Sequence, residues 1–248
     1  MKDLGKVVAS IEARMTSTRL PGKVLMPVLG KPILFYLVER LKSLAQVDEI
    51  VLATTINSQD DALEYFARSS NIQCYRGSED DVMLRVIEAV QSVNGNTIVE
   101  ITGDCPILDA DVASQVISLY QYSNVKYASN AHIRSYPDGM DVQVFSLDSL
   151  AQSEKITSNS LHREHVSLHI RENPSLFPQA NLLAPPSMHY PQLGLTLDEI
   201  DDFKLIKAII ENLYPINKLF GCQDILAFLT KNPDLEKLNE GVKRKGKT

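Results

Sequence analysis

The chain has 248 residues, of which 44% are hydrophobic and 23% charged, and it carries a net charge of −6. These values are typical of a globular protein with one large α/β domain or two small ones, and they exclude disorder over most of the chain. The negative charge argues against non-specific nucleic-acid binding, and no apolar run is long enough to span a membrane. Three cysteines without CxxC spacing predict neither a disulfide framework nor a zinc site, so a cytoplasmic location is expected.

The first predicted element is a buried strand that begins at Val7 and runs into a cationic loop over residues 13–23. Arg14, Arg19 and Lys23 are spaced along this loop, with serine, threonine and glycine between them. Arginine offers a planar fork to phosphate oxygens and lysine a compact charge. A loop that follows a strand of an open α/β sheet is also where such sheets bind ligands. The pattern favours a triphosphate site, although an ordinary solvated loop can carry the same three cations.

Strands and helices then alternate as far as residue 123. The expected strands are residues 49–54, 72–75 and 97–102, and the expected helices begin near Pro32, Asp60, Ser78 and Asp109. This alternation predicts a mostly parallel central sheet with helices on both faces, which is a Rossmann-like α/β fold.

Asp104 directly follows the expected strand over residues 97–102. The carboxyl end of a central strand lies at the mouth of the ligand crevice, where a metal-bound nucleotide would be placed. A lone carboxylate at this position can instead cap a helix, but Asp109 already supplies that cap. The run Asp109-Ala110-Asp111 is therefore interpreted as a helix start and not as a D-x-D metal motif.

The second half has a different pattern. We expect strands over residues 125–129, 142–145 and 193–197, a turn over residues 136–141, and a helix over residues 160–171. That helix would place His162, His165 and His169 on one face, which is the spacing of a metal site. No fourth ligand has an obvious spacing, so helix packing or a dimer contact are the alternatives.

The loop over residues 13–23 resembles the A-R-x-G-S-x-R-x-x-x-K signature of sugar cytidylyltransferases, above all the spore coat polysaccharide branch, whose relatives activate acidic sugars such as nonulosonates. Thr16 stands where this family usually has glycine, and a positive φ there would strain a β-branched residue. The resemblance implies that the loop wraps the phosphates of CTP and that Arg14, Arg19 and Lys23 are catalytic. The implied nucleotide-binding residues of this loop are Ala13, Arg14, Ser17, Thr18, Arg19 and Lys23.

Residues 76–82, Arg-Gly-Ser-Glu-Asp-Asp-Val, also match the spore coat branch, and the family architecture would place this turn near the base and ribose. The implied contacts are Arg76, Gly77, Ser78, Asp81, Thr102 and Gly103. The alternative is a helix start in which Ser78 is the cap and residues 79–81 form the first turn, and both can hold.

Three further motifs extend the resemblance to the metal and the sugar. The family's Gly-Asp-x-Pro motif implies that Asp104 binds Mg²⁺, and an element like Val-Asp-Thr-Pro-Glu-Asp-Leu implies that Asp198 is the second ligand. A Pro-x-Gly-x-Asp-Val stretch places Asp141 beside the acceptor sugar. An Arg-Glu-His-Val motif does the same for Arg163 and His165.

The sequence therefore predicts one nucleotidyltransferase domain over residues 1–230, with a nucleotide-binding half over about 1–123 and a sugar-binding half over about 124–230. The latter half could also form a homodimer. Residues 231–248 are expected to be a C-terminal tail, frayed from residue 241 onward. The implied reaction uses CTP, an acidic sugar and Mg²⁺. A nucleotide-sugar glycosyltransferase, a non-catalytic binding module, and a nucleotidyltransferase for another sugar or polyol are the alternatives.

Overall fold

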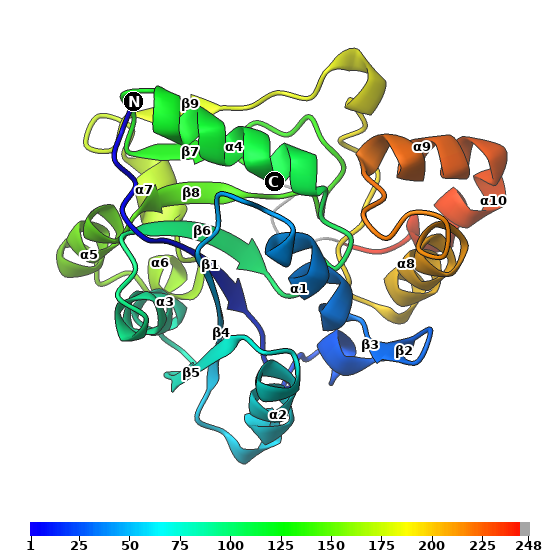
Figure 1. The fold of residues 1–248 in the computed structure, drawn as a ribbon, viewed down its shortest axis with the longest axis horizontal. Coiled ribbons are helices and arrows are strands. Elements are labelled where there is room, and N and C mark those ends of the chain that lie inside the picture. The colour runs from blue at the N-terminus through cyan, green and yellow to red at the C-terminus, as the bar shows by residue number, and fades with distance from the viewer. Residues whose placement is uncertain (244–248) are drawn as a thin grey trace.

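A computed structural model describes residues 1–243, and its main feature is a seven-stranded sheet in the order β5-β4-β1-β6-β8-β7-β9 (Figure 1). The strands are β1 (Val7–Glu12), β4 (Glu49–Thr55), β5 (Gln73–Gly77), β6 (Thr97–Thr102), β7 (Tyr127–Ser129), β8 (Gln143–Ser146) and β9 (Gln179–Asn181). All neighbours pair in parallel except β8, which is antiparallel to β6 and β7. The prediction of a mostly parallel, Rossmann-like sheet is confirmed.

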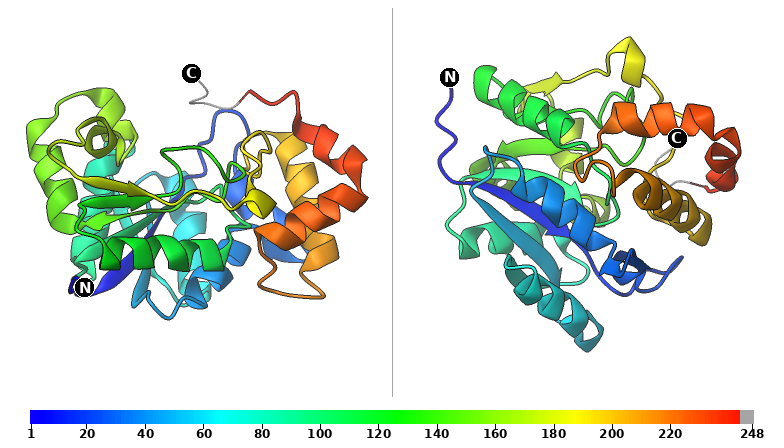
Figure 2. Two further views of the ribbon diagram at one scale, coloured as in Figure 1. Left: turned by 90° about the horizontal axis from the view of Figure 1, so that it is seen from above. Right: turned by 45° about the vertical axis from the view of Figure 1, so that its right-hand side comes forward.

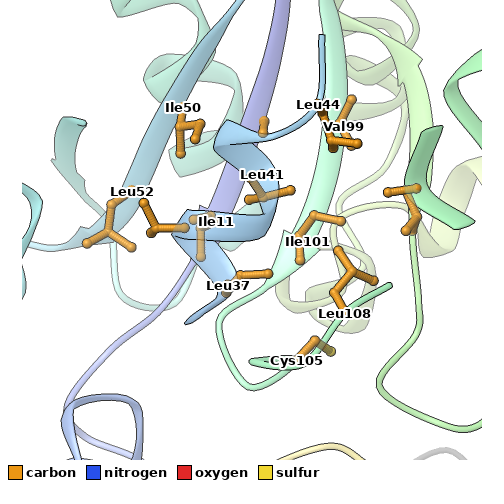
Figure 3. Packing of buried hydrophobic residues seen from close by; sticks show 14 of the residues in the cluster. Ile11, Leu37, Leu41, Leu44, Ile50, Leu52, Val99, Ile101, Cys105 and Leu108 are labelled. Atoms are coloured by element: carbon orange, nitrogen blue, oxygen red, sulfur yellow. The ribbon is translucent and has the colours of Figure 1, made fainter. Parts of the chain in front are cut away.

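Helices cover both faces of the sheet (Figures 1 and 2). On one face lie α1 (Leu34–Lys42), α2 (Asp61–Ser69) and α4 (Ala110–Tyr122), and on the other lie α3 (Val82–Ser92), α5 (Leu147–Ile156), α6 (Ser160–Glu164) and α7 (Leu168–Glu172). Alternation along the strands supplies both cores, since Ile11 packs toward α1 whereas Val8 packs toward α3. Figure 3 shows the first core, where Leu37 and Leu41 of α1 lie against Ile11 and Ile101.

A third group of helices follows the sheet along the chain and lies at the opposite end of the molecule from α5 and α6 (Figure 2). It consists of α8 (Ile200–Leu213), α9 (Cys222–Lys231) and α10 (Pro233–Glu236). Its core includes Ile206 and Ile225 together with Val28 of the two-stranded hairpin β2 (Pro27–Val28) and β3 (Lys31–Pro32). Single 3₁₀ turns occur at η1 (Lys23–Leu25), η2 (Ser58–Asp60), η3 (Pro186–Met188) and η4 (Lys237–Asn239).

Two expected elements of the second half differ in the structure. Residues 193–197 do not form a strand, because their pairing is limited to a single bridge between Asp138 and Gly194. The alternating leucines of this segment, Leu193, Leu195 and Leu197, are nevertheless buried, and they pack against α8 instead of in a sheet. The helix over residues 160–171 is also wrong, since α6 ends at Glu164 and α7 begins at Leu168. The break between them buries Val166 in the core beneath α3.

The helix starts were predicted with mixed success. Asp109 caps α4 as expected, because its carboxylate accepts the amides of the next turn at 2.8 and 3.1 Å. The expected Ser78 cap is wrong, since α3 begins at Val82 and its cap is Asp81, which accepts Leu84 N at 2.9 Å. Ser78 instead accepts the Asp81 amide at 3.1 Å, so a turn precedes the helix. Pro32 belongs to β3 and lies two residues before α1.

The C-terminal end of the described chain is packed structure. Residues 233–239, within the expected tail, form α10 and η4 beside α8. Asn239 is buried and donates from Nδ2 to Asp202 Oδ1 at 2.7 Å and to Gly194 O at 2.9 Å. Most of the frayed segment predicted from residue 241 lies outside the described residues. No helix within residues 1–243 is long and apolar enough to cross a membrane.

Candidate active site

A cavity of about 560 Å³ opens at the carboxyl ends of β1 and β6. It brings together ten of the residues that the sequence assigned to the site: Ala13, Arg14, Ser17, Thr18, Arg19, Lys23, Thr102, Asp104, His165 and Asp198. Its wall also includes residues that the sequence did not assign: Glu12, Val24, Glu79, Asp80, Val82, Arg85, Ser160 and Glu164. The two predicted metal ligands and the three predicted catalytic cations therefore share one cavity.

Lys23 is the most enclosed cation of the loop, with 9% of the residue exposed. Its Nζ donates to Asp104 Oδ2 at 2.9 Å and to Asp198 Oδ1 at 3.1 Å. Burial alone would lower the pKa of Lys23, but the two carboxylates outweigh it and the pKa is raised. Burial would likewise raise the pKa of Asp104, and the Lys23 ammonium holds it below its ordinary value. Two carboxylates from distant parts of the chain thus converge on one cation.

Arg19 adds a second positive charge to this cluster. Its Nη2 lies 2.6 Å from Asp198 Oδ1, and its Nη1 donates to Lys243 O at 3.1 Å. The loop reaches this geometry through Gly22, whose φ of +71° is in the left-handed region that favours glycine. Lys23 follows directly and begins the turn η1.

Thr16 fits the loop without backbone strain. Among residues 1–243, the non-glycine residues with positive φ are Leu29, Asn71 and Asn94. The Thr16 hydroxyl instead donates to Glu79 Oε1 at 2.9 Å.

Glu79 joins the loop over residues 13–23 to the turn that follows β5. Besides Thr16, its Oε1 accepts Arg14 Nη1 at 3.0 Å, and its Oε2 accepts Asn57 Nδ2 at 2.6 Å. The hydrogen bonds from Asn57 and Thr16, with the Arg14 charge, lower the pKa of Glu79. Asp60 also holds this loop in place, since its buried carboxylate accepts a hydrogen bond from Met15 N at 2.7 Å. Glu79 lay within a predicted motif, but nothing in the local sequence indicates these partners.

Glu12 and Arg85 line the cavity on its α3 side. Arg85 is 2% exposed, and its Nη1 donates to the carbonyls of Ser78 and Glu79, which fixes the turn before α3. Burial raises the pKa of Glu12, and Glu100 adds to this effect while Arg85 opposes it. A charged residue at the end of an otherwise buried strand was the sequence signal that could have singled out Glu12.

Arg76 points away from the cavity although the sequence placed it beside the base. Its Nη1 pairs with Asp61 at 2.6 Å and with Glu64 at 2.9 Å, both on α2. Its other nitrogens donate to the carbonyls of Thr55 and Asn57 at 2.9 and 2.7 Å. The side chain joins β4, β5 and α2. Gly77, Ser78, Asp81 and Gly103 are likewise absent from the cavity wall that the described residues form.

Of the three predicted sugar-side residues, His165 alone is in the cavity wall formed by the described residues. Arg163 joins α6 to the helices beside it, with Nε 3.1 Å from Asp81 Oδ2 and Nη2 2.8 Å from Glu154 Oε1. Asp141 pairs with Arg134 at 3.2 Å outside this cavity. Burial raises the pKa of Asp141 to about 6, against the opposing charge of Arg134.

The other two histidines of this region are held by hydrogen bonds. His162 contacts Thr157 Oγ1 at 2.6 Å and Glu172 Oε2 at 2.9 Å, and His169 contacts Ser153 Oγ at 2.8 Å. Their rings lie 5.1 Å apart, separated from the cavity that His165 lines. No group of three or more His, Cys, Asp or Glu within the described residues could hold a metal ion. This observation does not support the histidine metal site.

Comparison with known proteins identifies the family. Residues 8–219 match the family model described as cytidylyltransferase. The spore coat polysaccharide biosynthesis protein SpsF of Bacillus subtilis is 32% identical over 238 residues, covering 93% of this chain and 97% of that protein. A 3-deoxy-manno-octulosonate cytidylyltransferase of Geobacter metallireducens is 27% identical over 113 residues, 46% of this chain and 44% of that protein.

The likeness extends to three dimensions. The structure of a cytidylyltransferase from Leptospira borgpetersenii superimposes with a TM-score of 0.88 at 31% identity, covering 96% of this chain and 99% of that chain. The family model spans most of the chain and covers every residue that lines the cavity, from Glu12 to Asp198. The chain therefore belongs to the cytidylyltransferase family, and it is a CTP-dependent nucleotidyltransferase.

Proposed function

We propose that the protein transfers CMP from CTP to an acidic sugar of the nonulosonate kind and releases pyrophosphate, in the biosynthesis of a surface polysaccharide or glycoconjugate. The observation that carries this proposal is the convergence of Lys23 and Arg19 with Asp104 and Asp198 in one cavity. The names of the spore coat and 3-deoxy-manno-octulosonate relatives support the acidic sugar and the polysaccharide pathway.

Charge stabilisation is the main role that we assign to the loop over residues 13–23, which we call the phosphate loop. A sugar hydroxyl attacks the α-phosphorus in line, the bond to the bridging oxygen breaks, and pyrophosphate leaves with the electron pair. Negative charge accumulates on the transferred group and on the leaving pyrophosphate. Arg14, Arg19 and Lys23 are placed to meet it with fixed positive charge in a partly enclosed cavity.

A divalent cation fits the carboxylate end of the cavity. Asp104 and Asp198 already share one cation, the Lys23 ammonium, so their oxygens converge on a single point. Mg²⁺ takes one or two carboxylates from protein and completes its shell with phosphate and water oxygens. When bound, Mg²⁺ supplies positive charge to phosphoryl oxygens. We assign Asp104 and Asp198 as its ligands, and Lys23 then pairs with the triphosphate instead.

We assign the acceptor sugar to the part of the cavity beside the start of α3, where α6 and the residue after it form the wall. His165, Ser160 and Glu164 line this part of the cavity. His165 can pair with an acidic or hydroxyl group of the sugar, whereas Arg163 is held by Asp81 and Glu154 and positions α6. Asp141 lies with Arg134 outside the cavity and is a candidate for contact with a longer acceptor.

A screen of nucleoside triphosphates against acidic sugars tests the proposal. Pyrophosphate should be released when CTP and a suitable acidic sugar are both present, and a CMP-sugar should appear in equal amount by mass spectrometry. Release with neutral sugars or polyols alone would contradict the acidic acceptor. Consumption of a preformed nucleotide sugar without pyrophosphate release would favour a glycosyltransferase.

A further inference from the structure

The end of the described chain, residues 233–243, contacts the candidate active site, and we call it the C-terminal segment. It follows α9 and lies beyond residues 8–219, which the family model matches. After α10 and η4 the segment returns toward the loop that follows β1 (Figure 2). There the carbonyl of Lys243 accepts a hydrogen bond from Arg19 Nη1 at 3.1 Å. The C-terminal segment therefore reaches one of the cations of the phosphate loop.

The backbone that leads to Asp198 is fixed along one edge by two other parts of the chain. Leu197 N donates to the carbonyl of Asp104 at 2.8 Å, so the backbones of the two proposed Mg²⁺ ligands are joined one residue before Asp198. Leu195 N donates to the carbonyl of Asp138 at 2.6 Å. These bonds set the path of the backbone, and the peptide of Asp198 itself is held from the other edge.

One buried carboxylate holds that other edge. Asp202 Oδ2 accepts hydrogen bonds from Asp198 N at 3.0 Å and from Glu199 N at 2.9 Å. The bond from Glu199 belongs to the capping box that begins α8, which is a common arrangement at the start of a helix. The bond from Asp198 is additional, and it fixes the peptide of the proposed ligand. The orientation of the Asp198 side chain therefore depends on where the Asp202 carboxylate lies.

Asn239 of the C-terminal segment holds the Asp202 carboxylate. Its Nδ2 donates to Asp202 Oδ1 at 2.7 Å across 37 positions of sequence, and to Gly194 O at 2.9 Å. Asp202 is 0% exposed and Asn239 is 5% exposed. Aspartate is mostly exposed in proteins, where water can bond to its oxygens, whereas a buried carboxylate needs partners from the protein. One side-chain amide thus supports both ends of residues 194–198.

We propose that Asn239, acting through Asp202, positions Asp198 as a ligand of Mg²⁺, so that the C-terminal segment is part of the active site. This assignment rests on the metal-dependent transfer proposed above. Asn239 and Asp202 are positioning residues, since neither lines the cavity that the described residues form. Hydrogen-bond partners behind a metal ligand fix its orientation, and their loss typically weakens metal binding by about tenfold to a hundredfold.

Calorimetric binding of CTP, with Mg²⁺ and in EDTA, tests this role without an acceptor sugar. The ratio of the two affinities, which we call the magnesium enhancement, measures the part of CTP binding that depends on the metal. Asn239→Ala should lower the magnesium enhancement about tenfold and leave the affinity for CTP in EDTA nearly unchanged. If Asn239 only attached the C-terminal segment to α8, its loss would lower stability and leave the magnesium enhancement as in wild type.

Two variants on α8 are matched controls. Asn212→Ala removes a side-chain amide that donates to Ala208 O of the same helix. Ile210→Val reduces a side chain of the buried core and should lower the unfolding temperature. Both should keep the wild-type magnesium enhancement. A decrease in Asn239→Ala would then reflect neither the loss of an asparagine nor a lower stability, which thermal unfolding measures for each variant.

An exchange of the two side chains tests the path through Asp202. Asn239→Asp places a carboxylate against a carboxylate, and Asp202→Asn places an amide against an amide, so each should lower the magnesium enhancement. The double variant again has a donor opposite an acceptor, and its magnesium enhancement should exceed that of either single variant. A folded double variant without any magnesium enhancement would overturn the path through Asp202, even if Asn239→Ala fails to fold.

The outcomes separate the two proposals. If Asn239→Ala keeps the wild-type magnesium enhancement, Asn239 is not a positioning residue, while the transferase and its metal site stand. If wild-type protein binds CTP equally well with Mg²⁺ and in EDTA, the proposed metal site fails and the role of Asn239 with it. If wild-type protein binds no CTP in the presence of Mg²⁺, the proposed function fails together with both.

Discussion

Lys23 Nζ lies 3.1 Å from Asp198 Oδ1, although 175 positions separate the two residues in the sequence. The same ammonium lies 2.9 Å from Asp104 Oδ2, so the phosphate loop, the end of β6 and the segment before α8 meet at one charge. In this arrangement Lys23 occupies the place where two carboxylates would share a metal ion. If Asp104 and Asp198 bind Mg²⁺ as proposed, metal binding and triphosphate binding should be coupled through Lys23.

Removal of this charge should free the carboxylates for metal. Without nucleotide, Lys23→Met should bind Mn²⁺ about tenfold more tightly than wild type, because the ammonium no longer competes. Electron paramagnetic resonance of free Mn²⁺ measures the difference, and Lys207→Met on the exposed side of α8 is the control. Equal Mn²⁺ affinity in the wild type and Lys23→Met would contradict the shared position.

Lys23 and Arg19 should both be needed for turnover. Lys23→Ala or Arg19→Ala should lower kcat with CTP by about a hundredfold, the scale of losing one preorganised charge contact in a transition state. Steady-state pyrophosphate release measures this effect. Near-normal turnover in both variants would remove the loop cations from the mechanism.

The carboxylates should act as a unit. Asp104→Asn and Asp198→Asn should each lower activity by roughly a hundredfold or more, and the double variant should be scarcely slower than either one. EDTA should silence the wild-type enzyme, and added Mg²⁺ or Mn²⁺ should restore it. Activity that persists in EDTA, or a wild-type rate in Asp198→Asn, would show that the two-carboxylate site is wrong.

The ion pair also predicts how stability varies with pH. The folded pKa of Asp104 is below its ordinary value of 3.8, so its contribution is present above pH 3.8 and is lost as the pH falls through the folded pKa. The folded pKa of Lys23 is above 10.5, so its contribution is present below pH 10.5 and is lost as the pH rises through the folded pKa. The difference in unfolding free energy between wild type and Lys23→Met should therefore be flat between these limits. Denaturant unfolding at several pH values measures it, and a slope near neutrality would contradict the pairing.

Thr16 should be a useful residue of this loop and not a defect. Because its hydroxyl donates to Glu79, Thr16→Gly should raise the KM for CTP about fivefold, the effect of about 1 kcal/mol for one hydrogen bond. Thr16→Ser retains the hydroxyl and should resemble wild type. An unchanged KM in Thr16→Gly would show that the Thr16 hydroxyl does not contribute to CTP binding. A lower KM would show that the loop prefers the family's usual glycine.

Substitutions at Arg163 and His165 should have different effects, the first on stability and the second on acceptor binding. Arg163→Met removes the ion pairs with Asp81 and Glu154 and should lower the free energy of unfolding by about 1 kcal/mol, since these groups are partly exposed. His165→Gln should leave stability unchanged and raise the KM for the acceptor. Chemical unfolding and acceptor kinetics measure the two effects, and a reversed pattern would exchange the two roles.

Much of this site could be predicted because its signals are local. Parallel strands end at one edge of a sheet, so Asp104 after β6 and the cations after β1 were expected to share a crevice. Asp198 was placed correctly even though the segment before it is not a strand, because an extended approach to the cavity was sufficient.

The remaining features depend on contacts between distant segments. Nothing near Lys23 in the sequence indicates that its ammonium lies between two carboxylates, and Arg76 turns to α2 because of acidic residues more than ten positions away. The break between α6 and α7 contains neither glycine nor proline, and the burial of Val166 against α3 is what requires it. Glu12 and Arg85 likewise line one cavity only because β1 and α3 pack together.

The fate of the CTP phosphates tests the central claim most directly. With an acidic sugar that supports turnover, the α-phosphate label of CTP should appear in the sugar product, and the γ-phosphate label should appear in pyrophosphate, in equal amounts. This result requires attack of the sugar on the α-phosphorus. If the α-label is found in free CMP, or the γ-label in inorganic phosphate while the sugar stays unlabelled, the protein does not transfer CMP to a sugar.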